Sequence, residues 1–253
     1  MTSTTRYFAE LSYKGTLYHG WQIQPNALTV QELLNKALST LFRQPIESIG
    51  CGRTDTGVHA LQFFAHFDVA HTDDLTVISS LNSLNSLLPY DISVKRLFRV
   101  SPKAHARFDA TLRSYEYHIH FFKDPFRHHL SWLLHDVPDI DKMNEAAAAL
   151  LNYTDFSCFS KSNTQVATNK CTLSRAEWIE GHEGWVFHIS ANRFLRNMVR
   201  AIVGTLILVG RGAIPPNAIH DILRSKNRSN AGASVPACGL YLTHIRYPYI
   251  DPL

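Results

Sequence analysis

Stretches in which apolar and polar residues alternate run through the whole chain, and they outnumber the stretches with helical periodicity. Alternation with a period of two is typical of strands that bury one face. Several such stretches follow one another without an intervening helix, which favours antiparallel neighbours. The pattern predicts strands over residues 6–13, 58–69, 92–100, 112–121 and 239–247, and a hairpin over 175–190.

Helical periodicity appears in four segments between these strands. The clearest begins at Thr29, which forms a capping box with Glu32, and it ends before Pro45. A second helix is expected over 73–88, with an apolar side made of Leu75, Ile78, Leu81, Leu84 and Leu88. Two more are expected over 142–151 and 193–209, the last with Gly210 as its C-cap. The sequence therefore predicts an α+β fold with a mainly antiparallel sheet.

The composition indicates a packed globular protein. Of 253 residues, 45% are hydrophobic and 18% are charged, which is enough for one large domain or two modest ones. The formal charge of +4 permits a polyanionic partner without identifying one. The four cysteines have no zinc-binding spacing, so we expect reduced thiols. No signal peptide is apparent, and the most apolar stretch, 201–209, is too short to cross a bilayer, so we expect a soluble, cytoplasmic protein without membrane contact.

The stretch GCGRTDTGVHA, residues 50–60, places one carboxylate, Asp55, among hydroxyls, glycines and an arginine. The tripeptide DTG is typical of aspartic proteases, but these need two carboxylates that share a proton, and this chain has one copy. Arg53 also favours an ionised Asp55 over a shared proton. The plain alternative is that Asp55 closes an Asx turn, which is common for aspartate near glycine.

Three arginines recur with helical spacing in the segment NRFLRNMVRAIVG. Arg193, Arg196 and Arg200 are expected on one helical face, with Gly204 one turn further along it. A position without a side chain lets a ligand or a backbone segment come close. Such a stripe is either a solvated surface, a track for phosphates or a partner for a buried carboxylate.

Tyr115 lies on the expected strand 112–121 with Tyr117 on the same face. It is either an ordinary core residue or, with Arg107 and Arg113 nearby in sequence, a stacking platform for a nucleobase. No phosphate-binding glycine loop, metal-ligand spacing or GxSxG motif is present, and a metal site is not expected.

Several blocks occur together in an order that resembles the tRNA pseudouridine synthase A family. They are YKG at 13–15, YHGWQ at 18–22, VQE at 30–32, GRTDTGVHA at 52–60, HARF at 105–108, RSYEY at 113–117, NMVRAIVG at 197–204 and GLYL at 239–242. The resemblance covers nearly the whole chain. It departs from the family pattern at Lys14, at 195–197 and in the segment 160–171, and none of these departures touches Asp55.

This resemblance implies two RNA-recognition-like α/β halves whose sheets join into one large sheet, flanked by helices, with a central cleft. Residues 1–105 would form the half that carries the aspartate loop, and 106–253 the half that carries the tyrosine and the arginine helix. It also implies a homodimer that binds the tRNA anticodon stem-loop and isomerises uridine to pseudouridine at positions 38, 39 and 40 without a cofactor.

The resemblance further implies a role for each site residue. Asp55 matches the catalytic aspartate, Tyr115 the tyrosine that stacks on the target base, Arg53 the arginine that helps to displace that base, and Arg200 the arginine that pairs with the aspartate. The chemistry is consistent with one carboxylate, which acts either as nucleophile at C1′ or as base at C2′. Gly52 and Gly57 are expected to let the backbone turn tightly, so that Asp55 can point into a cleft. A non-catalytic RNA-binding protein on the same fold is the alternative.

Overall fold

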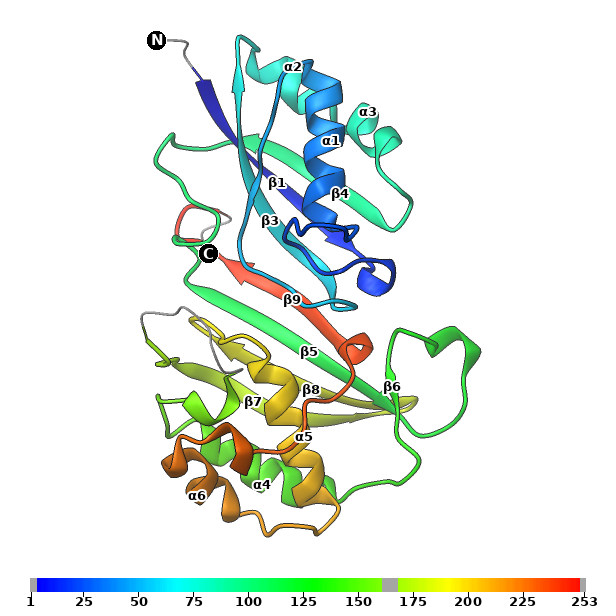
Figure 1. Ribbon diagram of the computed structural model, residues 1–253, viewed down its shortest axis with the longest axis vertical. Coiled ribbons are helices and arrows are strands. Elements are labelled where there is room, and N and C mark those ends of the chain that lie inside the picture. Colours follow the sequence, from blue (N-terminus) through cyan, green and yellow to red (C-terminus); the bar gives the residue numbers. More distant parts are fainter. Residues whose placement is uncertain (1–3, 161–167, 251–253) are drawn as a thin grey trace. The chain divides into compact units, whose positions relative to one another are not determined.

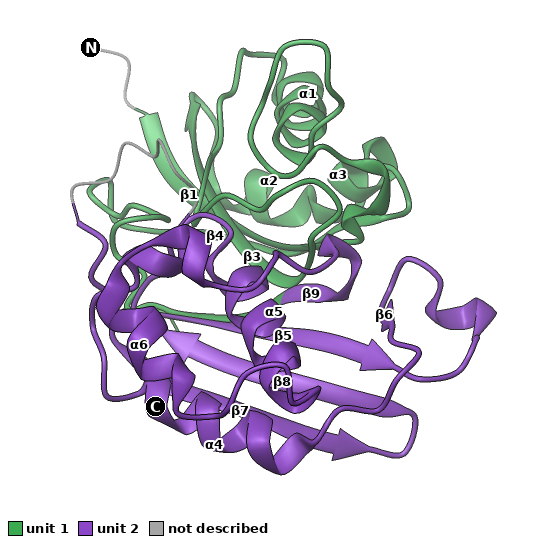
Figure 2. Ribbon diagram, turned by 60° about the horizontal axis from the view of Figure 1, so that its bottom comes forward, with its two compact units in different colours: residues 1–111, 242–253 green, residues 112–241 purple. Residues whose placement is uncertain are grey.

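The computed structural model describes residues 4–160 and 168–250, and it divides into two compact units. Unit 1 comprises residues 1–111 and 242–253, and unit 2 comprises residues 112–241 (Figures 1 and 2). The sequence predicts two continuous halves, 1–105 and 106–253, whereas the last strand returns the chain to unit 1. The assignment of functional roles to the two halves stays a prediction.

The sheet of unit 1 is antiparallel. Strand β1 (Thr4–Tyr13) pairs with β3 (His59–Ala70) on one side and with β4 (Ile92–Arg99) on the other. The short β2 (Ile49–Gly50) pairs with β3, and β9 (Leu240–Arg246) follows β3 in the strand order. Strands β1, β3, β4 and β9 match predicted strands, whereas β2 was not predicted.

Both faces of this sheet are covered, so that five successive residues of β1 are buried. Helices α1 (Val30–Phe42), α2 (Asp74–Ser79) and α3 (Leu81–Leu87) lie on one face (Figure 1). On the other face, the ring of Phe8 contacts those of Tyr247 and Tyr249, with centroids 5.5 and 6.3 Å apart. Because aromatic rings bury much apolar surface, these contacts give unit 1 a core of its own.

Helix α1 (Val30–Phe42) begins as its sequence predicts. Thr29 is the N-cap, and its side chain accepts a hydrogen bond from the backbone N–H of Glu32 at 3.4 Å. The 3-10 turn η1 (Gly15–Leu17) precedes it.

The single helix predicted over 73–88 is wrong, because the segment forms two helices, α2 (Asp74–Ser79) and α3 (Leu81–Leu87). Val77 and Leu84 are buried, whereas Leu75 is 80% exposed. The break lies at Ser80, which is the C-cap of α2 and the N-cap of α3 and whose hydroxyl donates to the carbonyl of Val77 at 2.7 Å. The Asp74 carboxylate accepts hydrogen bonds from the Tyr7 hydroxyl (2.6 Å) and an Arg99 nitrogen (3.0 Å), which ties the start of α2 to the strands.

The strands of unit 2 are β5 (Leu112–His120), β7 (Leu173–Gly181) and β8 (Gly184–Ala191). Strand β8 pairs antiparallel with both others, and the two-residue β6 (Trp132–Leu133) pairs parallel with β5. The predicted hairpin is confirmed as β7 and β8. Gly184, the first residue of β8 after the turn, has φ +145°, a conformation that favours glycine.

Helices α4 (Ile140–Leu150), α5 (Met198–Gly210) and α6 (Ala218–Ser225) cover one face of this sheet (Figure 2). The sequence predicts α4 and α5 but not α6. The prediction that Gly210 is the C-cap is wrong, because Gly210 lies inside α5. A Cβ at Gly210 would lie 2.7 Å from Pro138 and 2.8 Å from Met143, so this glycine permits close packing of α4 on α5.

The predicted fold class is confirmed in its coarser form. The described residues form nine strands and six α-helices. The pairs β1–β3, β1–β4, β2–β3, β5–β8 and β7–β8 are antiparallel, and the pair β5–β6 is parallel.

Candidate functional site

The loop that carries Asp55 and Arg53 connects β2 to β3 in unit 1. The Cys51 N–H donates to the carbonyl of Phe64 (2.8 Å), and the Val58 N–H donates to the carbonyl of Asp55 (3.1 Å), which closes a turn around the aspartate. Arg53 is exposed and Asp55 is partly exposed. The loop therefore presents both side chains at the surface of unit 1 from a defined backbone.

A second segment of unit 1, residues 13–21, braces this loop. The Trp21 N–H donates to the carbonyl of Thr54 (3.3 Å), and the Thr54 hydroxyl shares a buried 2.9 Å hydrogen bond with the Tyr13 hydroxyl. The Gly57 N–H donates to the carbonyl of Tyr18 at 3.3 Å. These bonds lie on both sides of Asp55, so the aspartate stands on a rigid part of the loop.

Two glycines allow this close approach, and only one of them was expected. Gly57 has φ +81°, which supports its predicted role in a tight turn. Gly20 has φ +84°, and a Cβ there would lie 2.2 Å from the carbonyl oxygen of Thr54. Gly52, predicted to serve the same turn, has no positive φ and no atom within 4 Å of an added Cβ. That prediction is wrong for Gly52, and the YHGWQ block contains the glycine that matters.

Tyr115 lies on β5 of unit 2, opposite Ile189 of β8. It is half-buried, and its ring meets the ring of Phe194 edge-on, with centroids 5.1 Å apart and an interplanar angle of 87°. An edge-on neighbour fixes the plane of a ring. Phe194 was not among the predicted site residues, although it lies between Arg193 and Arg196 in the sequence.

The prediction of three arginines on one helical face is wrong. Helix α5 begins only at Met198, because Asn197 at its N-cap has φ +66° and interrupts the helical backbone. Arg193 and Arg196 precede the helix, and only Arg200 of the three belongs to it.

Arg200 is held by residues 231–236, a segment that lies along α5 and that we call the strap. The Arg200 Nε donates to the carbonyl of Val235 at 2.7 Å, and the Val235 N–H donates back to the carbonyl of Arg200 at 3.3 Å. Because Nε is engaged, the plane of the guanidinium is set by the strap. Its positive charge also acts on the Tyr117 hydroxyl, opposing the burial that raises the pKa of that phenol.

The strap reaches α5 at two glycines. A Cβ at Gly204 would lie 1.8 Å from the carbonyl oxygen of Ala233, so the expected close approach at Gly204 is made by backbone. The Gly232 N–H donates to the Thr205 hydroxyl at 2.8 Å. The Arg228 guanidinium donates to the carbonyls of Ala231 and Gly232 at 3.3 and 3.0 Å, and to the Ser234 hydroxyl at 3.1 Å. The strap is therefore tied at both ends.

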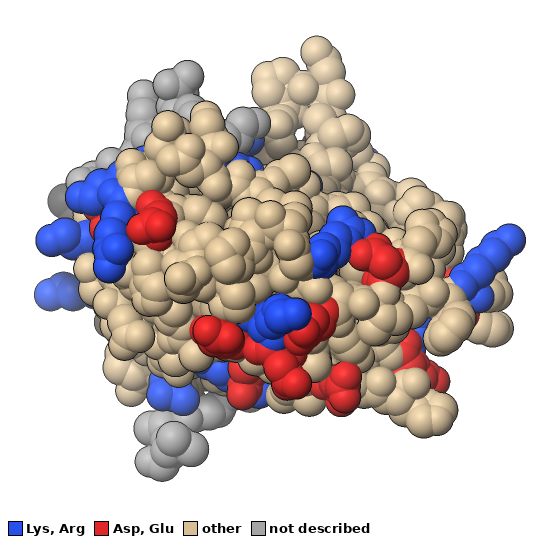
Figure 3. Space-filling model, turned by 90° about the horizontal axis from the view of Figure 1, so that it is seen from below, with Lys and Arg blue, Asp and Glu red and all other residues tan. Residues whose placement is uncertain are grey.

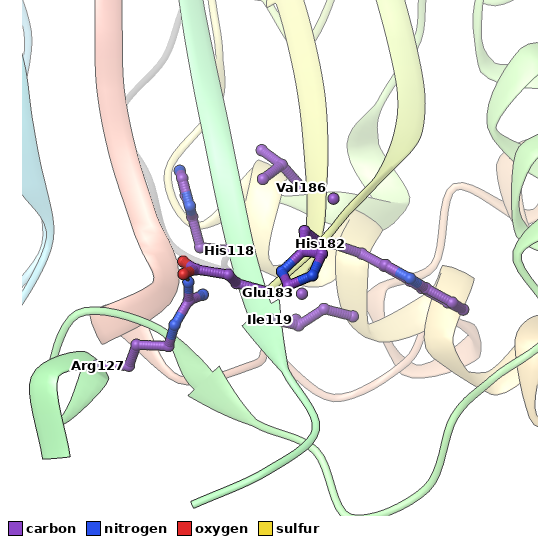
Figure 4. A pocket seen from close by; sticks show the side chains of 9 residues that line it. His118, Ile119, Arg127, His182, Glu183 and Val186 are labelled. Carbon is purple, nitrogen blue, oxygen red and sulfur yellow. Dashed lines mark hydrogen bonds and ion pairs between the residues drawn. The ribbon is translucent and has the colours of Figure 1, made fainter. Parts of the chain in front are cut away.

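Each unit has a recess of its own. That of unit 2, of about 390 Å³, lies between β5, the β7–β8 turn and Arg127 (Figure 4). That of unit 1, of about 490 Å³, is lined by residues that include Phe98, Lys103 and Tyr249. None of the four predicted site residues lines either recess.

Charged side chains of both signs lie close together on the face drawn in Figure 3. Many arginines are paired within one unit, such as Arg6 with Asp68 (2.8 Å) and Arg99 with Asp74 (3.0 Å). An arginine that is paired with a carboxylate attracts a polyanion less strongly. The remaining attraction comes from the net charge of +4 and is modest.

Among residues 4–160 and 168–250, no group of histidine, cysteine and acidic side chains could hold a metal ion. The four cysteines are free thiols, as expected. In the same part of the chain, no helix is long and apolar enough to span a membrane. Of the divergent segment 160–171, residues 161–167 lie outside the described residues.

Comparison with known proteins identifies the family. The sequence model of a family described as tRNA pseudouridine synthase matches residues 146–248. A protein of Bacteroides fragilis named tRNA pseudouridine synthase A is 51% identical over 97% of this chain and 98% of its own length. Proteins of the same name from Bacteroides thetaiotaomicron and Thermoanaerobacter are 51% and 40% identical over 96% and 94% of this chain, and 91% and 97% of their own lengths. At this identity over nearly the full length, the chain belongs to the tRNA pseudouridine synthase A family.

Proposed function

We propose that this protein isomerises uridine to pseudouridine at positions 38, 39 and 40 of the tRNA anticodon stem-loop. The observation that supports this most is the 51% identity over 97% of the chain to a relative named tRNA pseudouridine synthase A. The reaction breaks the C1′–N1 bond, turns the base and joins C5 to C1′. The C5 hydrogen leaves as a proton and N1 gains one, so the atoms balance without an oxidant, a reductant or a metal.

Asp55 is the catalytic residue in this proposal. It acts on the sugar, either as nucleophile at C1′ or as base at C2′. The hydrogen bonds of Thr54 and Gly57 to residues 13–21 support this role, because a reacting carboxylate must be held in position. Arg53, exposed on the same loop, helps to displace the target base from its stack and contacts phosphate.

Tyr115 and Arg200 bind the substrate. The Tyr115 ring, kept in its plane by Phe194, stacks on the detached base so that the base is not lost before C5 bonds to C1′. Arg200 supplies the guanidinium that pairs with the catalytic carboxylate. The bond from its Nε to Val235 supports this role, since a paired guanidinium must keep a fixed orientation.

The finer predictions of fold and assembly belong to this proposal. They are two RNA-recognition-like halves whose sheets join into one around a central cleft, a homodimer that binds tRNA, and a cytoplasmic location. The alternating strands and helices of each unit support the first of these.

Release of tritium from unmodified tRNA labelled at C5 of uridine tests the function, because pseudouridine formation must detach that hydrogen. Asp55→Asn should keep tRNA binding and the folded state and abolish release, since an amide neither attacks C1′ nor accepts a proton. If the wild-type protein binds tRNA without releasing tritium, the alternative function holds, and the protein is a non-catalytic RNA-binding protein. Substantial release by Asp55→Asn would reject the assigned chemistry.

A further inference from the structure

The connection between β5 and β6, residues 121–131, presents aromatic rings to solvent, and we call it the aromatic loop. Phe122 is 84% exposed and Phe126 is 87% exposed. Phenylalanine is usually buried, so two such rings on one short loop indicate a surface that binds another molecule.

The exposure of these rings does not come from a loose backbone. The loop contains the 3-10 turn η2 (Pro125–Arg127), and the Asp124 carboxylate caps it by accepting the N–H of Phe126 at 2.8 Å. The N–H groups of Leu130 and Ser131 both donate to the carbonyl of Arg127, at 2.9 and 3.1 Å. The hydrogen bonds therefore hold the loop in a conformation that keeps its rings in water.

Arg127 anchors the aromatic loop to the β7–β8 turn. Its guanidinium pairs with Asp124 of the loop and with Glu183 of the turn, and Figure 4 shows Arg127 and Glu183 pointing toward one another. His118 and His182 line the recess beside this pair. The rings thus stand on a braced platform, and a partner that binds them meets little entropic cost for ordering the loop.

The cations of the loop decide which partner fits. Lys123 lies next to Phe122 in sequence, is exposed, and forms no ion pair with any residue of the described part of the chain. His128 is also exposed. Exposed rings beside cations suit the binding of unstacked nucleotides, because the bases stack on the rings and the phosphates pair with the cations. A second copy of this chain suits the surface less well, because a two-fold contact centred on the loop would bring its like charges together.

We propose that the aromatic loop is a second RNA-binding surface, at which Phe122 and Phe126 stack on unpaired bases of the tRNA while Lys123 and His128 contact its phosphates. The inference rests on tRNA as the substrate. It adds a contact on unit 2, whereas Asp55 belongs to unit 1, so it concerns binding of the tRNA and not the isomerisation.

The test measures the Kd for unmodified tRNA together with KM and kcat. The double variant Phe122→Ala/Phe126→Ala should raise Kd and KM by about 100-fold, roughly tenfold for each of the two stacked bases, with kcat unchanged. Phe126→Trp, which keeps a stacking ring, should retain the wild-type Kd. Tyr90→Ala is the matched control: Tyr90 is fully exposed and lies beside Asp91, so its removal should leave Kd and KM unchanged.

Two results would overturn the proposal. One is an unchanged Kd and KM in the double variant. The other is a dimeric wild-type protein, by light scattering at micromolar concentration, that becomes monomeric in the double variant, because the loop is then a contact between copies. The Kd arm is read independently of tritium release, so a failure of the proposed activity is not confused with a failure of this surface.

Discussion

The contact between the strap and α5 makes Gly204→Ala an informative perturbation, because two effects of opposite sign compete. Alanine in the middle of a helix is more favourable than glycine by about 1 kcal/mol. Against this, the new Cβ would lie 1.8 Å from the carbonyl oxygen of Ala233, about half of an ordinary contact distance. Overpacking of this kind costs about 1 to 3 kcal/mol.

Relief of the clash requires the strap to move away from α5. That movement stretches the hydrogen bonds from Gly232 N–H to the Thr205 hydroxyl (2.8 Å) and from Arg200 Nε to the carbonyl of Val235 (2.7 Å). Each lost hydrogen bond costs about 1 kcal/mol. We therefore expect a net loss of about 3 kcal/mol in the free energy of unfolding, because a steric cost of about 2 and a hydrogen-bond cost of about 2 outweigh a gain of about 1 in helix propensity.

Urea unfolding and tritium release together measure both consequences. Turnover should fall by about 100-fold at temperatures where the variant is folded, since displacement of a substrate-binding group by about 1 Å has that effect. Gly52→Ala is the control for stability, because an added Cβ there meets no atom within 4 Å. A Gly204→Ala protein that is more stable than wild type would refute the steric argument. A destabilised variant with normal turnover would refute the role of the strap in orienting Arg200.

Three further outcomes are expected. Tyr115→Ala should weaken tRNA binding or turnover far more than Tyr115→Phe, because only the latter keeps the stacking face; equal, negligible effects measured by Kd and kcat would place Tyr115 away from the substrate. Arg200→Met should leave Kd within about tenfold while turnover falls severely, as lost orientation of the carboxylate affects the reacting state most; near-normal kcat would assign the partner of Asp55 elsewhere. Burial, helped by the charge of Arg6, lowers the pKa of His66 to about 4 from 6.5, so the unfolded chain binds a proton that the folded protein does not. Stability should fall as the pH drops from about 6.5 to 4, and urea midpoints should show a shallower fall in His66→Gln.

Local residue patterns predicted the elements whose signals lie within one segment. The alternation in β1, β3, β5 and the β7–β8 hairpin, and the cap at Thr29, depend on neighbours a few residues apart, and their predictions are confirmed. The split of 73–88 into α2 and α3 was not predictable in this way. Apolar periodicity continues through Ser80, where the helix breaks, and periodicity does not reveal the hydrogen bond from the Ser80 hydroxyl to the carbonyl of Val77.

The candidate site divides in the same manner. The family-like sequence blocks that contain Asp55, Tyr115 and Arg200 identified these residues as candidates, because a family is recognised by which residues occur in which order. Periodicity alone misjudged the arginine segment, because it cannot reveal the positive φ of Asn197 that delays the start of α5.

The sequence by itself determined the family, the longer strands and helices and the single carboxylate in its glycine-rich loop. Only the tertiary structure decided what holds that loop and Arg200 in place. Gly20 lies against the backbone of Thr54, and Gly204 against that of Ala233. Both contacts are made to backbone atoms, and these atoms are the same in every residue type. In the sequence, each contact is therefore visible only as a glycine. A glycine does not reveal which backbone segment packs against it.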